Sequence, residues 1–388
     1  MGPAMEYDYI VFGGGMAGAS VAYELSADAR VCLIEREASV GYHATGRSAA
    51  LFAPSYGGRE VRGLTRASHD FFMAPPEGFT HAPLLTRRSA MYIARENQGG
   101  ALDVMVAEIR RSGGVIDRLT MADALQAVPL LRADYVAGAA IDHDAHDIDV
   151  DALHQGFLRG ARARGAQIMT GAGDPTVSRR DAVWRVDLAT GPVSAPVAIN
   201  AAGAWGDRVA TAFGAQPIGL TPLRRTAVLV DPPFGVDIMG WPAVIDVDET
   251  FYFKPDAGKL LISPADETLV EPCDVQPEEL DIAIGVDRVQ AALRLDVERV
   301  NHSWAGLRTF APDRAPVIGF DPEIDGLFWS VGQGGYGIQT APAWARTAAA
   351  LAQGRPLPAD IAAEGLDPAH VSPSRFRAEQ PSLQRLAQ

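Results

Sequence analysis

Residues 7–35 read YDYIVFGGGMAGASVAYELSADARVCLIE. The mostly apolar run at 7–12 ends in glycines, a stretch of small residues follows, and a second apolar run at 31–34 ends on Glu35. This order predicts a buried strand, a helix and a second parallel strand, which together form one βαβ unit. The fold therefore begins with a doubly wound α/β arrangement.

The glycines of this unit have the spacing of a dinucleotide-binding turn. Gly13 permits a tight turn, Gly15 lets the backbone approach a pyrophosphate, and Gly18 lets the helix pack closely on the strand. The N-terminus of the helix offers free N–H groups and positive dipole to phosphate. Glu35, about twenty residues on, is placed to accept the hydroxyls of an adenosine ribose, and its charge disfavours the 2′-phosphate of NADP.

Three further stretches of small residues suggest that the backbone approaches a ligand again. They read GYHATGRSAA at 41–50, NAAGAW at 200–205 and GQGGYG at 332–337. A small-residue helix is expected at 338–350, so that a second helix N-terminus points at the same ligand.

Other segments have a different pattern. A helix is expected at 152–165, introduced by aspartates that suit its N-cap and first turn. Alternation at 224–230 and 248–263 predicts antiparallel strands, with a hairpin turn at 256–259. Additional strands are expected at 167–170, 183–188, 197–200 and 327–331.

Composition limits the class of protein. The 388 residues suggest two or three domains, and 47% hydrophobic with 21% charged residues is typical of a folded chain. A net charge of −14 makes nucleic acid an unfavourable partner. Two cysteines, Cys32 and Cys273, suit a reducing compartment, and neither a transmembrane segment nor a signal peptide is apparent, so we expect a cytoplasmic protein.

The glycine turns together resemble the D-amino-acid oxidase family of FAD enzymes. Within that family the chain is most similar to the bacterial D-arginine dehydrogenases, and the resemblance spans residues 6–375. The motifs that carry it lie at 41–50, 151–156, 251–258, 304–308 and 333–340.

The resemblance implies an α/β protein (α+β overall) with a discontinuous doubly wound FAD-binding domain and a smaller substrate domain built on an antiparallel sheet. FAD is expected to be bound non-covalently, because neither cysteine lies in an attachment motif. The FAD-binding domain is expected at 5–86, 147–215 and 305–375, the substrate-binding domain at 87–146 and 216–304, and a flexible tail at 376–388.

The activity implied is oxidative deamination of a D-amino acid, by hydride transfer from the substrate Cα to flavin N5. The imine product then hydrolyses to a 2-oxo acid and ammonia. The residues expected to bind the cofactor are Gly13, Gly15, Gly18, Glu35, Arg36, Thr45, Gly46, Arg47, Ser48, Ala49, Ala202, Gly203, Trp205, Gly334, Gly335, Tyr336, Gly337 and Ile338.

The substrate carboxylate needs a receptor, and a planar guanidinium binds a carboxylate through two hydrogen bonds. Matching the family places Arg225 and Arg308 on that carboxylate, with Tyr252 and Tyr56 adding phenolic hydrogen bonds. Backbone N–H groups at and after Gly335 are expected to stabilise negative charge on the flavin. The glycines that follow Tyr56 would let its loop act as a lid.

The side-chain pocket is expected to be apolar. Ala90 stands where the D-arginine dehydrogenases carry a glutamate that pairs with the substrate guanidinium, and Leu51 replaces a histidine. An unpaired guanidinium would be costly to desolvate there, so neutral side chains are favoured over D-arginine. The pocket is expected to comprise Leu51, Ala53, Ala90, Ala243, Ile245 and Gln339.

Several alternatives remain open from the sequence. The substrate could be an N-methyl amino acid such as sarcosine or a 2-hydroxy acid, or the chain could be a flavin-binding subunit of a larger complex. The electron acceptor, the oligomeric state and the group that takes the amine proton are undetermined. No metal site is expected at His143 and His146, and core packing is favoured over stacking on a ligand for Trp205, Trp304 and Trp329.

Overall fold

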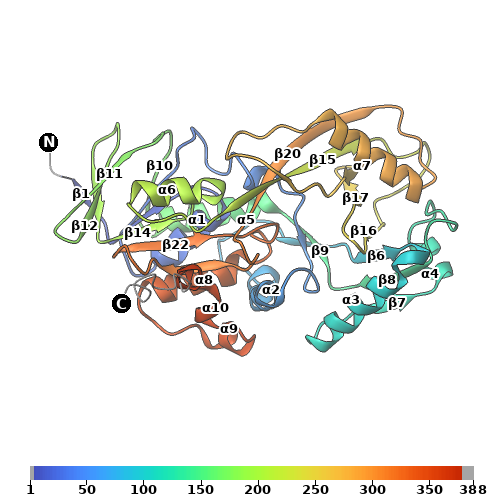
Figure 1. The fold of residues 1–388 in the computed structure, drawn as a ribbon, viewed down its shortest axis with the longest axis horizontal. Coiled ribbons are helices and arrows are strands. Elements are labelled where there is room, and N and C mark those ends of the chain that lie inside the picture. The colour runs from blue at the N-terminus through green and yellow to red at the C-terminus, as the bar shows by residue number, and fades with distance from the viewer. Residues whose placement is uncertain (1–3, 378–388) are drawn as a thin grey trace, which may run out of the picture.

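A computed structural model describes residues 4–377 of the chain. Figure 1 shows an elongated molecule with a parallel sheet and its helices at one end and a larger, mainly antiparallel sheet at the other. The predicted tail at 376–388 lies, from residue 378 onward, outside the described residues.

The parallel sheet is built from the apolar runs identified in the sequence. Five parallel strands are followed by one antiparallel edge strand, and four of the five carry side chains that are buried or nearly so, whereas the edge strand at 167–169 is half-buried or exposed. The order is β10 (Gln167–Met169), β3 (Val31–Ile34), β2 (Tyr9–Phe12), β14 (Val197–Asn200), β22 (Leu327–Val331) and β21 (Val317–Phe320).

Helices and a small sheet cover the two faces of the parallel sheet. On one face α1 (Met16–Leu25), α5 (Val150–Ala163) and α8 (Ala341–Ala352) share a single apolar core with the strands. On the other face α6 (Gly206–Ala212) and the four-stranded sheet enclose a second core around Trp184. That sheet has the order β1 (Met5–Glu6), β13 (Val193–Ala195), β12 (Val183–Asp187) and β11 (Thr176–Arg180).

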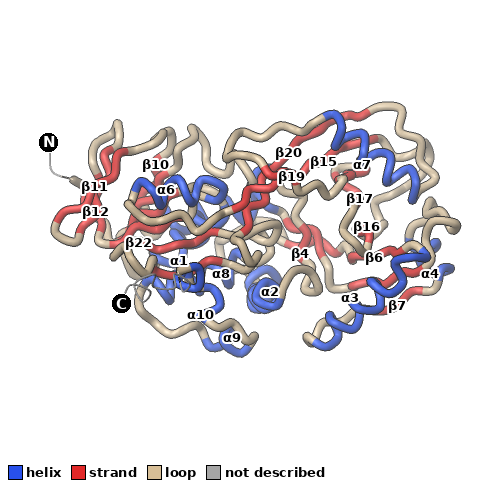
Figure 2. Tube along the Cα trace, viewed as in Figure 1, coloured by secondary structure: helices blue, strands red, loops and turns tan. Residues whose placement is uncertain are grey.

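The large sheet forms the other end of the molecule. Its long central strand, β15 (Thr221–Val230), pairs with the equally long β20 (Val300–Phe310), and Figure 2 shows the two strands running together towards the parallel sheet. The order is β19 (Thr268–Leu269), β15, β18 (Lys259–Ser263), β17 (Tyr252–Asp256), β16 (Ala243–Asp246), β6 (Ala90–Ala94), β8 (Gly138–Asp142) and β7 (Asp117–Leu119).

Strand register divides the side chains of this sheet between two faces. Val228 pairs with Ile262, Ile262 with Phe253, and Phe253 with Val244, and all four are buried in a core with α7 (Glu279–Ala292) and α4 (Met121–Ala127). Because side chains alternate along a strand, the residues next to these four in each strand, and those paired with them, lie on the opposite face of the sheet. That face carries Arg225, Arg308, Tyr252, Ile245, Ala243 and Ala90.

Shorter elements complete the fold. A separate three-stranded antiparallel sheet has the order β4 (Leu51–Phe52), β9 (His146–Ile148) and β5 (Leu85–Arg87). The remaining α-helices are α2 (Arg59–Met73), α3 (Gly99–Arg111), α9 (Ala359–Ala363) and α10 (Pro368–Val371), and single 3₁₀ turns lie at Thr45–Arg47, Glu96–Gln98, Gly203–Trp205 and Pro373–Phe376.

Several local predictions are confirmed, and one helix start was wrong. The Asp149 carboxylate caps α5 by accepting the Ala152 N–H at 2.8 Å, and the hairpin at 256–259 turns through positive φ values at Ala257 and Gly258. The helix expected from 338 begins only at Ala341. Residues 336–340 form a separate turn, in which the Thr340 hydroxyl donates to the Tyr336 carbonyl at 2.8 Å.

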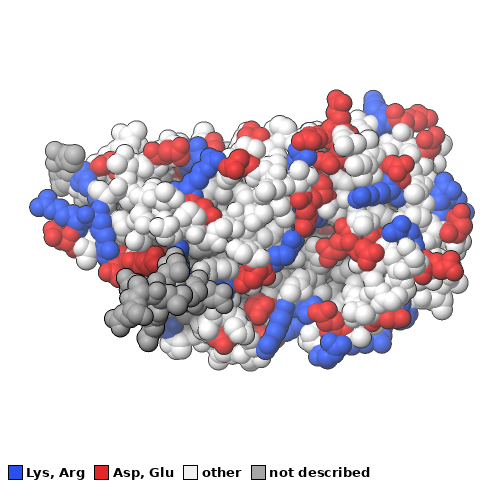
Figure 3. Space-filling view, in the orientation of Figure 1, with Lys and Arg blue, Asp and Glu red and all other residues white. Residues whose placement is uncertain are grey.

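Acidic and basic side chains are mixed over the molecular surface. Figure 3 shows Asp and Glu distributed among Lys and Arg across one face, with no continuous basic area on the described part of that face. This distribution accords with the net charge of −14.

Gly18 provides a direct test of the packing at the first turn. A Cβ at Gly18 would lie 1.8 Å from the Gly13 carbonyl oxygen, so Gly18→Ala must push α1 away from β2 and should lower the free energy of unfolding by about 3 kcal/mol. Gly100→Ala is the matched control, because nothing lies within 4 Å of its Cβ and helix propensity should raise stability by about 0.5 to 1 kcal/mol. Thermal unfolding measures both, and equal melting temperatures would contradict the close approach.

Candidate active site

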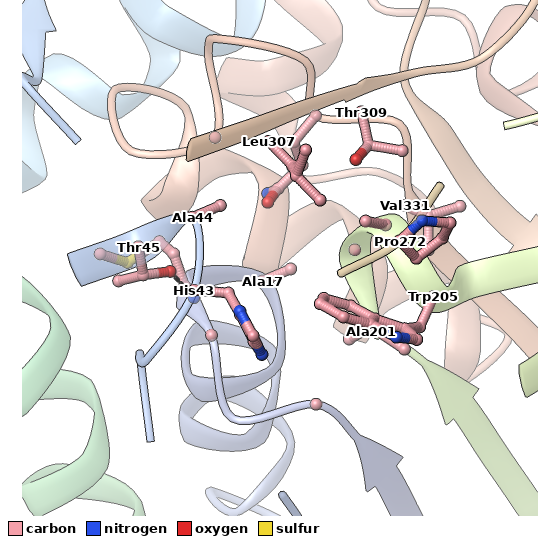
Figure 4. A pocket seen from close by; sticks show the side chains of 18 of the residues that line it. Ala17, His43, Ala44, Thr45, Ala201, Trp205, Pro272, Leu307, Thr309 and Val331 are labelled. Atoms are coloured by element: carbon pink, nitrogen blue, oxygen red, sulfur yellow. Dashed lines mark hydrogen bonds between the residues drawn. The ribbon is translucent and has the colours of Figure 1, made fainter. Parts of the chain in front are cut away.

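One large cavity lies at the carboxyl ends of the parallel strands and reaches the open face of the large sheet. Its volume is about 700 Å³, which lies within the range of cofactor and ligand pockets. The cavity runs from Glu35 and Arg36 past the glycine turns to Arg225 and Arg308. Figure 4 shows His43 and Thr45 on one side and Trp205 and Pro272 on the other.

The turn between β2 and α1 is held open towards this cavity by side chains from elsewhere. The Gly14 N–H donates to Glu35 Oε2 at 2.7 Å, and the Met16 N–H donates to the Thr45 hydroxyl at 2.9 Å. A Cβ at Gly13, where φ is +107°, would lie 2.5 Å from the Ala201 carbonyl oxygen. The backbone of the turn therefore faces the cavity without a side chain in the way.

A buried histidine supports the same turn from behind. His154 on α5 lies with Nε2 2.9 Å from the Gly14 carbonyl oxygen, and the Gly41 N–H donates to that oxygen at 3.1 Å. Burial lowers the pKa of His154, so its ring is neutral at pH 7 and Nε2 acts as the N–H donor. His154 thus joins the first glycine turn to the second.

An aromatic group lines the end of the cavity near Glu35. The His43 and Trp205 rings lie 4.5 Å apart, and the Arg36 guanidinium lies 5.5 Å from the Trp205 ring. His43 Nε2 is 3.0 Å from a Glu37 carboxylate oxygen, whereas His43 Nδ1 is buried with no partner. An unpartnered polar atom is costly unless a ligand satisfies it, so this end fits the polar part of a dinucleotide.

Two arginines face each other at the opposite end. Arg225 on β15 pairs in register with Gly306, two residues from Arg308 on β20, so both side chains lie on the same face of the sheet. Arg225 Nε donates to the Asp266 carbonyl at 2.9 Å, and its Nη2 lies 3.3 Å from Glu267. Burial and the charge of Arg308 lower the pKa of Arg225. A bound anion would relieve this repulsion.

Arg308 has no carboxylate partner among the described residues at ion-pair distance. Tyrosines surround it instead, namely Tyr56, Tyr252 and Tyr336. The Tyr56 and Tyr336 rings meet edge to face at 5.1 Å, and the Tyr56 hydroxyl donates to Glu249 at 3.3 Å. Burial raises the pKa of Tyr56, so its hydroxyl stays protonated and can donate a hydrogen bond.

Most of the residues expected to bind the cofactor line the cavity. Three expected ones do not: Gly18 and Gly46 instead allow backbones to meet, since Cβ atoms there would lie 1.8 Å and 2.7 Å from carbonyl oxygens, and Tyr336 packs against Tyr56. The others are all cavity residues: Gly13, Gly15, Glu35, Arg36, Thr45, Arg47, Ser48, Ala49, Ala202, Gly203, Trp205, Gly334, Gly335, Gly337 and Ile338.

The expected side-chain pocket lies beside the cavity and does not line it. Ala53, Ala90 and Ala243 are 1%, 0% and 4% exposed, and the Tyr92 hydroxyl lies among them, 3.4 Å from the Ser55 hydroxyl. Gln339 is also buried, and its Oε1 accepts the Ala53 N–H at 3.1 Å. Leu51 and Ile245 are half-buried against the same cluster.

The structure adds cavity residues that the sequence motifs did not single out. His43 was visible only as part of the 41–50 motif, and Pro272 and Cys273 had no signal, because their segment meets the cavity only through the tertiary fold. Trp329 is fully buried, as expected for core packing, whereas Trp205 lines the cavity. Trp304 is half-buried, and its indole N–H donates to the Arg47 carbonyl at 2.9 Å.

The described residues contain neither a cluster of metal ligands nor a helix suited to a membrane. Within residues 4–377 no group of three or more His, Cys, Asp or Glu side chains could hold a metal ion. His146 Nδ1 instead lies 2.8 Å from the Asp144 carbonyl oxygen. No helix among the described residues is long and apolar enough to cross a bilayer.

Comparison with known proteins connects this geometry to a family. Residues 8–351 match the profile of the family described as FAD dependent oxidoreductase. The chain is 24% identical to glycine oxidase of Bacillus licheniformis, over 90% of this chain and 94% of that protein. It is 25% identical to hydrogen cyanide synthase subunit HcnC of Pseudomonas aeruginosa, over 92% of this chain and 94% of that protein.

Solved structures share the fold. Glycine oxidase from Geobacillus kaustophilus superposes with a TM-score of 0.80 at 22% identity, covering 91% of this chain and 96% of that one. L-proline dehydrogenase from P. horikoshii superposes with a TM-score of 0.81 at 20% identity, covering 97% of this chain and 99% of that one.

The contact between Gly335 and Arg308 can be tested directly. A Cβ at Gly335 would lie 2.8 Å from Arg308 Nη1, so Gly335→Ala should displace the guanidinium and raise KM for carboxylate substrates about ten- to a hundredfold. Gly240→Ala is the matched control, because nothing lies within 4 Å of its Cβ. Steady-state kinetics at equal flavin content measures the effect, and an unchanged KM would place Arg308 away from the substrate.

Proposed function

The chain belongs to the FAD-dependent oxidoreductase family and uses FAD, and we propose that within this family it oxidises D-amino acids. The products would be an imine, which hydrolyses to a 2-oxo acid and ammonia. The similarity of the motifs at 41–50 and 333–340 to those of D-arginine dehydrogenases supports an amino-acid substrate. The observation that carries the proposal is the pair of arginines at the end of the cofactor cavity.

The arginine pair is suited to a carboxylate. Arg225 and Arg308 repel each other, three tyrosines lie around Arg308, and both arginines line the cavity. A carboxylate between two guanidinium groups gains charge-assisted hydrogen bonds that a neutral group would not. We assign the carboxylate to Arg225 and Arg308, with hydrogen bonds from the hydroxyls of Tyr252 and Tyr56.

The cofactor can be assigned to the rest of the cavity. The Gly13 to Gly15 turn and the N-terminus of α1 suit the pyrophosphate, and Glu35 suits the ribose hydroxyls. Two unpartnered atoms of cavity residues could contact the cofactor, Gln333 Nε2 as a donor and His43 Nδ1 as an acceptor, since His43 Nε2 faces the Glu37 carboxylate. We assign the backbone at 335–337 to the flavin end, where N–H groups would stabilise negative charge.

Bound FAD would supply the two-electron acceptor for oxidation of the substrate Cα–N bond. The protein's own part is to hold the carboxylate at Arg225 and Arg308, so that the Cα is presented to the flavin end of the cavity in one orientation. Tyr56 and Tyr336 pack over this end and reduce the access of water. We further propose the division into an FAD-binding part at 5–86, 147–215 and 305–375 and a substrate-binding part at 87–146 and 216–304.

The side-chain preference follows from the charge of the arginines. Ala90, Ala243 and Ile245 lie beside the cavity, whereas Arg225 and Arg308 line it, and their positive charge supports neutral over cationic substrates. A second candidate is a substrate with little or no side chain, such as glycine or sarcosine. It is favoured by the burial of Ala53 and Ala90, which leaves the cavity ending near the arginines.

A substrate series separates these candidates. Anaerobic reduction of the flavin and kcat/KM should be measured with D-leucine, D-methionine, D-phenylalanine, D-lysine, D-arginine, glycine and sarcosine. Neutral D-amino acids should lead over D-lysine and D-arginine. If glycine and sarcosine lead, the second candidate holds, and if D-arginine leads in the parent protein, another carboxylate such as Glu249 must serve the guanidinium.

Arg308→Met tests the carboxylate receptor. Loss of a charge-assisted contact costs about 1.5 to 3 kcal/mol, so KM for every carboxylate substrate should rise about ten- to a hundredfold while the spectrum of the bound flavin stays nearly unchanged. Arg66→Met is the control, because Arg66 pairs with Glu364 away from the cavity. Unchanged kinetics for Arg308→Met would remove this residue from substrate binding.

A further inference from the structure

A short segment of the large-sheet region forms part of the wall of the cofactor cavity. Residues 271–274, Glu-Pro-Cys-Asp, lie between β19 and α7. Pro272, Cys273 and Asp274 line the cavity, and Figure 4 places Pro272 beside Trp205. We call residues 271–274 the strap.

Apolar residues anchor the chain on both sides of the strap. The Val270 N–H donates to the Pro222 carbonyl at 3.1 Å, and Val270 packs against the small cluster that contains Val275. That cluster also contains Ala204 next to the cavity, together with Ala305 and Leu307 from β20. Val275 is buried and Val270 partly buried, whereas the four residues between them are exposed or half-exposed.

Two ion pairs tie the strap to the other wall of the cavity. Asp274 pairs with Arg47 and accepts a hydrogen bond from the Tyr42 hydroxyl at 3.2 Å, and Glu271 pairs with Arg208 at 3.1 Å. Tyr42, Arg47 and Arg208 all line the cavity and belong to segments around the parallel sheet.

Arg47 is the main attachment point. Besides Asp274, its Nη1 donates to the Val275 carbonyl at 2.8 Å and to the Ala305 carbonyl at 3.1 Å, and its guanidinium carbon lies 5.5 Å from the centre of the Tyr42 ring. Three N–H donors of Arg47 are thus used within the protein, which assigns the side chain mainly to holding the strap.

We propose that the strap retains FAD, because the cofactor can leave the cavity only after the pairs of Asp274 and Glu271 have separated from Arg47 and Arg208. The carboxylates carry the same sign of charge as the pyrophosphate, so their pairing with these arginines also removes a repulsion from the bound state. The proposal rests on FAD as the cofactor and is independent of which substrate is oxidised.

The first test measures release of FAD from the holoenzyme. Dilution of the purified yellow protein, followed by the rise in free-flavin fluorescence, gives the dissociation rate. Asp274→Asn should raise this rate about five- to tenfold, and the double variant Glu271→Gln/Asp274→Asn should raise it further. Raising ionic strength should speed release from the parent more than from the double variant, since exposed ion pairs are screened by salt.

A matched control is available on the large sheet. Asp231 is an exposed carboxylate paired with Lys259 and Asn301, and it does not line the cavity. Asp231→Asn removes a comparable ion pair, so it should leave FAD release unchanged if the effect belongs to the strap.

The second test uses the thiol within the strap. Cys273 is exposed, whereas Cys32 is fully buried and burial raises its pKa to about 12, so alkylation of the folded holoenzyme reports on Cys273. Iodoacetamide should label Cys273 about threefold or more faster in the double variant than in the parent, because Cys273 lines the cavity and its cavity side is uncovered whenever the strap separates from FAD. Absence of labelling in Cys273→Ser confirms the site.

The outcomes decide the proposal. Faster FAD release in the strap variants, together with faster labelling and an unchanged Asp231→Asn control, supports it. FAD release from the double variant at the parent rate overturns it, whatever the substrate proves to be. A failure to find D-amino-acid oxidation would leave both measurements valid, since neither uses a substrate.

Discussion

The hydrogen bond from the Gly14 N–H to Glu35 joins the two ends of the first βαβ unit, and the rest of the site depends on it. Two glycines keep the turn in this position, since a Cβ at Gly18 would collide with the Gly13 carbonyl and a Cβ at Gly13 would collide with the Ala201 carbonyl after β14. Once the turn is held this way, its carbonyl at Gly14 is reached by Gly41 and by His154. One close backbone approach therefore organises three separate segments around the cofactor cavity.

Repulsion between two arginines governs the other end of the cavity. Arg225 and Arg308 lie on neighbouring strands of one sheet face, and burial makes their mutual repulsion stronger than it would be in water. Glu267 compensates Arg225 in part, and Arg314 shares that carboxylate. The protein thus maintains a site of concentrated positive charge surrounded by phenols, which is the condition for selecting an anionic group on a small molecule.

The long strands β15 and β20 connect the two ends. They pass from the large sheet to the parallel sheet, so the arginines they carry are placed against the same cavity as the glycine turns. Residues that approach from the large-sheet side, including the strap and Tyr252, meet loops of the parallel sheet across this cavity. Ion pairs such as that of Arg47 with Asp274 therefore join residues that are far apart in the chain. They connect the two walls of the cavity through side chains alone.

The sequence by itself determined the α/β class, the glycine turn with Glu35, the N-cap of α5 and the hairpin at 256–259, because each depends on local backbone geometry or on periodicity. It also identified a part of the cavity lining, including Trp205, since these residues lie within motifs. The tertiary structure alone decided the start of α8, the burial of Ala53 and Ala90, and the place of Pro272 and Cys273 in the cavity wall. These features depend on which distant segment packs nearby, and neither spacing nor composition carries that information.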